Sequence, residues 1–128
     1  MPRHRIELVC PGLVTPSNNT LINETKWKKG PRRKEYLWAI KSAQLVAKRA
    51  GVRVWPPLGA FVDMTIISYR PRKIDHNNLA GGAKQLIDAV VSNEIITDDS
   101  PKYCRNHYEQ HTDRANPRTI VVIEWDEP

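Results

Sequence analysis

Residues 59–69 constrain the fold of this chain more than any other segment. Apolar side chains occupy both alternating faces of the segment, and Asp63 is its only charged residue. A strand with two apolar faces is typical of a position inside a sheet, where other elements cover it. We therefore predict a central strand here, which the rest of the chain must surround.

Segments on either side supply the other elements. Alternating or strongly apolar patterns predict strands at 3–9 and 118–125, and the polar segment 102–111 fits an edge strand. Apolar residues at helical spacing predict amphipathic helices over about 32–50 and 78–92. The order β-α-β-α-β-β predicts an α+β fold, with a small mixed sheet of about four strands and two helices. The length of 128 residues fits one domain that covers the whole chain.

Two connecting segments and the second predicted helix contain turn or breaker residues. Residues 15–20 are a polar turn cluster, and residues 26–34 are a basic loop that carries Trp27. Gly81 and Gly82 each lower the helix propensity of the second helix by about 1 kcal/mol relative to Ala. Such a pair indicates close approach by another backbone or by a ligand, or simply tight packing.

Charge is unevenly distributed along the chain. Residues 1–53 contain 12 Lys or Arg and 3 Asp or Glu, whereas residues 54–128 contain 8 and 11. A basic half suits contact with a phosphate backbone, and an acidic half suits a bound cation. Scattered charge on an ordinary soluble protein is the alternative interpretation.

The sequence favours a cytoplasmic protein with no membrane partner. No apolar run approaches the ~20 residues of a membrane-spanning helix. The N-terminus lacks the apolar stretch of a secretory signal. Cys10 and Cys104 form no CxxC pair, and we expect both to be reduced.

Acidic and amide side chains flank the second helix. Asp75 and Asn77 lie at the strand-to-helix junction, and Asp98 and Asp99 follow the helix. If the helix packs back on the sheet, these oxygens could converge on a divalent cation such as Mg²⁺. Lys84 could then approach a scissile phosphate and stabilise its transition state. The alternatives are ordinary helix caps, an acidic turn and a surface ion pair.

Basic and aromatic residues surround this candidate site. Those in the loop after the central strand are expected to contact phosphates, because they border the site directly. Trp27 could stack on a base, although a solvated charge run is an equal alternative around it. The predicted DNA-contacting basic and aromatic residues are Lys26, Trp27, Lys28, Lys29, Arg32, Arg70, Arg72 and Lys73. No groove-reading helix is evident, so we expect recognition of DNA shape.

A zinc site is a weaker hypothesis. Cys104, His107 and His111 could ligate zinc, but their C-x2-H-x3-H spacing misses the usual paired pattern. Polar positions on an edge strand or its turn are the favoured interpretation.

The order of several short motifs resembles one enzyme family. Ile-Asp-His-Asn-Asn-Leu at 74–79, Lys84, Ile-Asp-Ala at 87–89 and Ile-Thr-Asp-Asp at 96–99 are similar to the signature of RusA-type Holliday-junction resolvases. Pro-Ser-Asn-Asn at 16–19 resembles the early turn of that family. The motifs span nearly the whole chain in the family's order.

The resemblance implies a homodimeric endodeoxyribonuclease, bacterial or phage-encoded, that nicks four-way DNA junctions symmetrically. It also implies Mg²⁺ as cofactor, with Mn²⁺ as a substitute, held by aspartates. The matched catalytic and metal-binding positions are Asp75, Asn77, Lys84, Asp98 and Asp99, and the matched DNA-contacting turn positions are Asn18 and Asn19. Asp88 matches a further acidic position of undefined role.

Asn77 departs from the family pattern, which has Asp at this position. Its neutral carbonyl oxygen can still ligate a cation, but metal affinity and water activation should both fall. A naturally weakened enzyme, a junction-binding protein that does not cut and an enzyme disabled on purpose all fit this residue. A phosphohydrolase of small phosphate esters is a further hypothesis for the same acidic residues.

Overall fold

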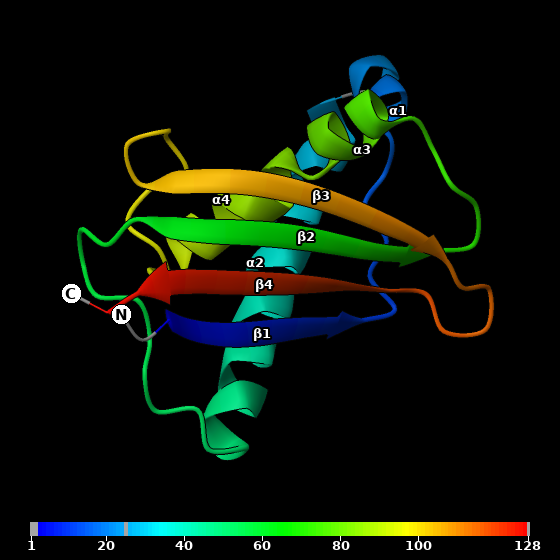
Figure 1. The fold of residues 1–128 in the computed structure, drawn as a ribbon. Coiled ribbons are helices and arrows are strands. Elements are labelled where there is room, and N and C mark those ends of the chain that lie inside the picture. The colour runs from blue at the N-terminus through cyan, green and yellow to red at the C-terminus, as the bar shows by residue number, and fades with distance from the viewer. Residues whose placement is uncertain (1–2, 25, 128) are drawn as a thin grey trace.

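Four strands form one mixed sheet in the computed structural model, which describes residues 3–24 and 26–127 apart from the side chain of Lys26. The strands are β1 (Arg3–Pro11), β2 (Val62–Arg70), β3 (Cys104–Thr112) and β4 (Arg118–Asp126), in the order β1-β4-β2-β3. Helices α2 (Lys26–Arg49) and α4 (Lys84–Ser92) lie behind one face of this sheet, and α1 (Asn18–Asn23) and α3 (His76–Gly82) lie beyond its β3 edge (Figure 1). The predicted α+β class is confirmed.

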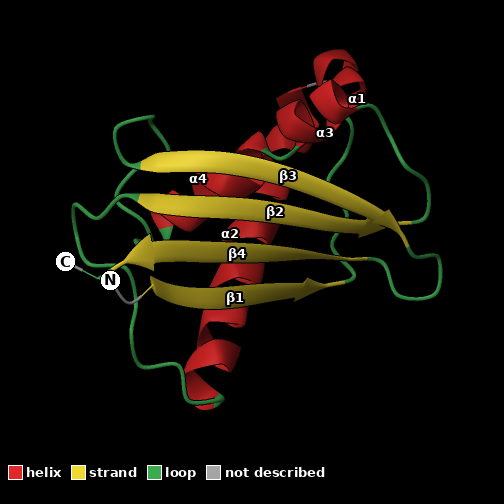
Figure 2. Cartoon of the chain, in the orientation of Figure 1, coloured by secondary structure: helices red, strands yellow, loops and turns green. Residues whose placement is uncertain are grey.

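The central position predicted for residues 59–69 is also confirmed. β2 pairs in parallel with β3 and antiparallel with β4, while β1 pairs antiparallel with β4. Val62, Met64 and Ile66 face the helices and are fully buried. Ile67 and Tyr69 face the other side, where they are half-buried and no described helix covers them (Figure 2). The apolar side chains on the second face of β2 are therefore partly covered by the neighbouring strands, and no second layer of described helices covers them.

The described residues contain four helices instead of the two predicted ones. They are α1 (Asn18–Asn23), α2 (Lys26–Arg49), α3 (His76–Gly82) and α4 (Lys84–Ser92). The predicted polar turn at 15–20 is partly helical, because the Ser17 hydroxyl accepts a hydrogen bond from the amide of Thr20 and caps α1. The single helix predicted over about 78–92 is divided at Ala83, directly after the glycine pair.

The basic loop predicted at 26–34 is wrong, because these residues form the first turns of α2. Gly30 and Pro31 each disfavour a helix interior. Pro31 nevertheless lies inside α2. Trp27 is consequently presented from a helix rather than from a loop, with 81% of its surface exposed.

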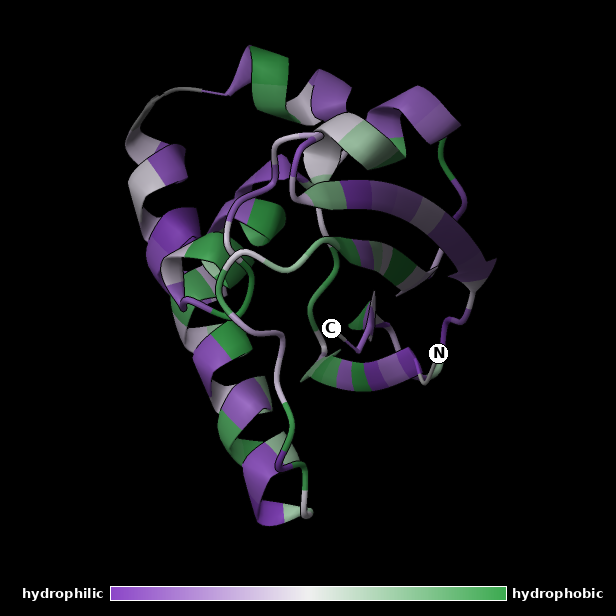
Figure 3. Ribbon diagram, turned by 60° about the vertical axis from the view of Figure 1, so that its left-hand side comes forward, coloured by the Kyte–Doolittle hydropathy of each residue, from purple (hydrophilic) through white to green (hydrophobic). Residues whose placement is uncertain are grey.

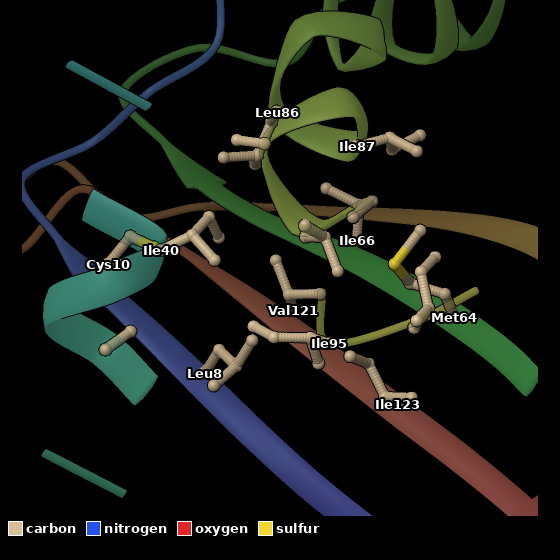
Figure 4. Packing of buried hydrophobic residues seen from close by; sticks show 14 of the residues in the cluster. Leu8, Cys10, Ile40, Met64, Ile66, Leu86, Ile87, Ile95, Val121 and Ile123 are labelled. Carbon is tan, nitrogen blue, oxygen red and sulfur yellow. The ribbon is translucent and has the colours of Figure 1, made fainter. Parts of the chain in front are cut away.

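The hydrophobic core lies between the sheet and the helices α2 and α4. Ile40 of α2 and Leu86 of α4 are fully buried against the inner side chains of β1, β2 and β4. Figure 4 shows these side chains converging on Ile66 and Val121 from both layers. Figure 3 shows β3 as the most hydrophilic strand, as the prediction of a polar edge strand requires. The core thus fixes the sheet and leaves its β3 edge to carry polar groups.

Candidate nucleic-acid interface and acidic site

The early turn and the start of the second predicted helix meet in space, although they lie about 60 residues apart. Figure 1 shows α1 lying beside α3. The backbone amide of Asn19 donates a hydrogen bond of 3.3 Å to the side-chain oxygen of Asn78. The Pro-Ser-Asn-Asn turn and the first turn of α3 therefore form one surface at this end of the molecule.

Gly81 and Gly82 make this contact possible. A Cβ atom at Gly82 would overlap the carbonyl oxygen of Pro16, and one at Gly81 would lie 2.6 Å from Cγ of Asn18. Of the alternatives considered for the glycine pair, close approach by another backbone is the one observed. Asn18, predicted to contact DNA, is half-buried against Gly81, whereas Asn19 is exposed.

Asp75 and Asn77 are both exposed at the beginning of α3. Asp75 occupies the N-cap position, and its carbonyl oxygen accepts the amide of Leu79 at 2.9 Å. Its carboxylate makes no capping hydrogen bond. The simple capping interpretation therefore leaves the Asp75 carboxylate unexplained, and this side chain is accessible to a ligand.

The acidic turn after α4 is held by its own hydrogen bonds. Asp98 accepts the backbone amide of Asp99 at 2.9 Å, and the Thr97 hydroxyl accepts the amide of Gly59 at 2.7 Å. Asp98 thus has the role of an ordinary turn residue, which was one of the alternatives for this pair. Both aspartates are half-buried.

Tyr108 of β3 links the acidic turn to α3. The ring of His76 lies edge-on to the Tyr108 ring, with centroids 6.0 Å apart. Burial raises the pKa of Tyr108, and the charges of Cys104 and Asp99 raise it further. The first turn of α3 and the acidic turn therefore both act on the middle of the same edge strand.

The acidic residues do not form a ready-made metal site in this conformation. Among residues 3–24 and 26–127, no three or more His, Cys, Asp or Glu side chains are grouped so that they could hold a metal ion. Asp75, Asp98 and Asp99 thus do not fit a three-carboxylate Mg²⁺ site as they stand. β3 also separates the candidate zinc ligands, since Cys104 is buried while His107 and His111 are exposed on the other face.

Lys84 is exposed at the first position of α4. Within the part of the chain that the structure describes, it forms no salt bridge with Asp88, so the predicted surface pair is not observed. The ammonium group is therefore available to an external phosphate.

The predicted DNA-contacting cations differ widely in exposure. Lys28 and Lys29 are exposed on α2, and Arg72 and Lys73 are exposed in the loop after β2. The side chain of Lys26 lies outside the described residues. The four exposed cations are free to contact a phosphate backbone.

Arg32 is tied to Glu24 instead of being free. The two side chains form a salt bridge of 2.6 Å that joins α2 to the end of α1. The hydrogen bond from Arg32 lowers the pKa of the Glu24 carboxyl. Arg32 is therefore partly a structural residue of this surface.

A Glu24→Gln substitution tests that link through its pH dependence. Because the folded-state pKa of Glu24 is lowered, the ion pair stabilises the fold above the ordinary Glu pKa of about 4.3 and loses this effect as the pH falls through the lowered value. We expect the melting temperature of Glu24→Gln to lie below that of the unchanged chain at pH 7, and the gap to close in acid. Glu94→Gln, at an exposed site with no salt bridge among the described residues, should show no such gap; equal behaviour of the two variants would contradict the link.

Arg70 corrects the prediction of an exposed basic loop after the central strand. It is the last residue of β2, shares the inner face with Val62, Met64 and Ile66, and is only 6% exposed. Its guanidinium donates to the carbonyl oxygens of Thr15 (3.0 Å) and Arg72 (3.3 Å) and to the Ser68 hydroxyl (3.2 Å). Strand alternation alone would have placed it inward, had the strand been extended by one residue.

No protein-family model matches this chain, and a search of the curated proteins found no match either. None of the described helices is long and apolar enough to cross a membrane. Function is therefore inferred from the order of the motifs and from the geometry of the described residues.

Proposed function

We propose that this chain acts on branched DNA as a metal-dependent, structure-selective endodeoxyribonuclease of the RusA type. The observation that carries the proposal is the contact between the Pro-Ser-Asn-Asn turn and α3. Asn18 packs on Gly81, and the amide of Asn19 bonds to Asn78. Two motifs that resemble one family in sequence thus share one surface, although the core does not require them to meet.

The charges around this surface suit a phosphate backbone. Exposed cations lie on the first turns of α2, in the loop after β2 and at the start of α4. Their spread over three elements favours recognition of the shape of a DNA junction rather than of base sequence. Lys84, exposed and without an acidic partner among the described residues, is proposed to offset charge on the reacting phosphate.

The acidic residues near this surface are the candidates for the chemical step. Asp75 and Asn77 lie at the beginning of α3, which is beside the turn, and the charge of Asp99 helps to raise the pKa of Tyr108 on β3. As they stand, the carboxylates of the described residues do not form a preformed metal site. In the proposed enzyme, Asp75 and Asp99 are the carboxylates on which cleavage depends.

A second candidate function is a junction-binding protein that does not cut DNA. Two observations favour it. Position 77 carries a neutral Asn, and the described acids are not grouped for a metal ion. Both candidates require the same DNA-binding surface and, by the resemblance, a symmetric dimer. They differ only in whether strands are broken.

Selective binding to branched DNA tests what the two candidates share. In gel-shift titrations, we expect the chain to bind a four-way junction at least tenfold more tightly than a linear duplex of the same arm sequence. Neutralising Lys28 and Lys29 together should weaken junction binding and flatten its dependence on salt, because fewer counterions are released. Neutralising Lys102, an exposed lysine in the loop before β3, is the matched control. Equal affinity for junction and duplex would overturn both candidates.

A further inference from the structure

A pocket of about 480 Å³ opens beside the contact between the early turn and α3. It lies between residues 14–17, the end of β2 and the α2 segment around Arg32 and Tyr36. Two of its lining side chains, Arg32 and Arg70, are cations, and one exposed carboxylate, Glu35, lies on its wall. Glu24 neutralises Arg32 through their salt bridge of 2.6 Å, and Glu35 is exposed to solvent screening. The positive charge left for a ligand of this pocket is therefore that of Arg70.

Arg70 enters this pocket as a buried cation without a carboxylate partner. Among the described residues, no Asp or Glu oxygen lies within salt-bridge distance of its guanidinium. Its three recorded hydrogen bonds all go to neutral oxygen atoms. A guanidinium has five N–H donors, so two remain for another acceptor. A buried charge without a counter-charge is costly, and a bound anion would offset that cost.

Unused polar atoms from two other elements lie on the same wall. Thr15 is 1% exposed, and its hydroxyl has no hydrogen-bond partner among the described residues. Nη1 of Arg32 is likewise buried and without a partner in the described part of the chain. Buried polar atoms are normally paired. A buried hydroxyl and two guanidinium groups beside one cavity are the donor types that bind a tetrahedral oxyanion.

We infer that this pocket binds a phosphate group, with Arg70 and Thr15 as direct donors and Arg32 on its wall. Arginine offers a planar pair of donors that matches two phosphate oxygens, and the Thr15 hydroxyl can donate to a third. The phosphate belongs either to the DNA backbone or to a free phosphate compound. If it belongs to DNA, the inference rests on the proposed function and assigns the early turn an anchoring contact away from Asp75. Binding of free phosphate does not depend on the proposed function.

Titration with inorganic phosphate tests the pocket directly. At constant ionic strength, we expect phosphate and sulfate to raise the melting temperature of the intact chain, while chloride does not. Thr15→Val should weaken phosphate binding about tenfold, because one hydrogen bond to a charged group is lost. The fold should tolerate this change, since the hydroxyl has no partner within the described protein. Thr65→Val, on the uncovered face of β2, is the matched control and should leave binding unchanged.

Arg70→Met provides the second variant, which removes the guanidinium, keeps an unbranched side chain and should abolish the phosphate effect. Failure of phosphate to stabilise the intact chain, or an unchanged effect in Thr15→Val, would overturn the inference. Gel shifts with the four-way junction identify the source of the phosphate. Weaker junction binding by Thr15→Val assigns the pocket to DNA. Unchanged junction binding, together with lost phosphate binding, assigns it to a free phosphate compound and leaves the proposed function intact.

Discussion

Gly82→Ala is expected to lower the free energy of unfolding by about 3 kcal/mol, at the upper end of the usual cost of overpacking a well-packed site. The added methyl group would overlap the carbonyl oxygen of Pro16. A backbone carbonyl cannot rotate away as a side chain could, and the ring of Pro16 restricts the backbone further. The early turn would have to separate from α3. Urea denaturation monitored by circular dichroism measures the change.

Gly30→Ala is the matched control for this substitution. Gly30 is also helical, but no atom lies within 4 Å of the position of an added Cβ. Ala should therefore stabilise α2 by up to about 1 kcal/mol through helix propensity alone. The two variants should change stability in opposite directions. If both were neutral or stabilising, the early turn would not lie on α3, and the surface proposed to bind DNA would lose its basis.

Asn77→Asp is expected to raise junction cleavage on the order of 10- to 100-fold, the range by which changes around a metal centre alter activity. The substitution is nearly isosteric and exposed, so the fold should be unaffected. It restores a negative charge beside Asp75, and carboxylate oxygens are the preferred ligands of Mg²⁺. Nicking of a labelled four-way junction in Mg²⁺, followed over time on denaturing gels, gives the rate.

Asn116→Asp controls for the added charge in that comparison. Asn116 is exposed in the turn between β3 and β4, and the variant should cleave no faster than the unchanged chain. An Asn77→Asp protein that binds junctions but does not nick them would favour the second candidate, a binding protein. Equal gains in both variants would indicate a nonspecific effect of charge.

The central layers could be predicted because they depend on local alternation. The two apolar faces of residues 59–69 place β2 inside the sheet, and the polar composition of residues 102–111 places β3 at its edge. The glycine pair at 81–82 indicates close approach by another backbone or by a ligand, or simply tight packing, and the structure shows the first of these. The partner itself, Pro16, could not be derived, because it depends on how a distant turn folds back over the helix.

Local breaker residues account for the predictions that failed. Gly30 and Pro31 favour a loop, yet α2 continues through them, and its middle packs Tyr36 and Ile40 into the core. Tertiary packing thus outweighs propensity here. Arg70 was assigned to a loop because it is charged and precedes Pro71. Strand pairing extends through it and carries it to the buried face.

The acidic site could be predicted only as a set of residues. Asp75 precedes the segment that contains α3 and α4, and the Asp98–Asp99 turn follows it. The break between the two helices at Ala83, which the sequence does not predict, changes the direction of the chain between these acidic residues. Asp98 bonds to the Asp99 amide, and Asp75 remains exposed. His76 of α3 contacts Tyr108, but no three metal ligands are grouped among the described residues.

Mapping the nicks made by Asn77→Asp in a four-way junction tests the proposed nuclease most directly. With Mg²⁺ present, the account predicts two nicks at equivalent positions in opposite strands of the junction, none in a linear duplex and none after chelation of the metal. Adding Asp99→Asn to the same protein should abolish the nicks while junction binding persists. Intact junction strands in the Asn77→Asp protein, or nicks that survive the loss of Asp99, would contradict it.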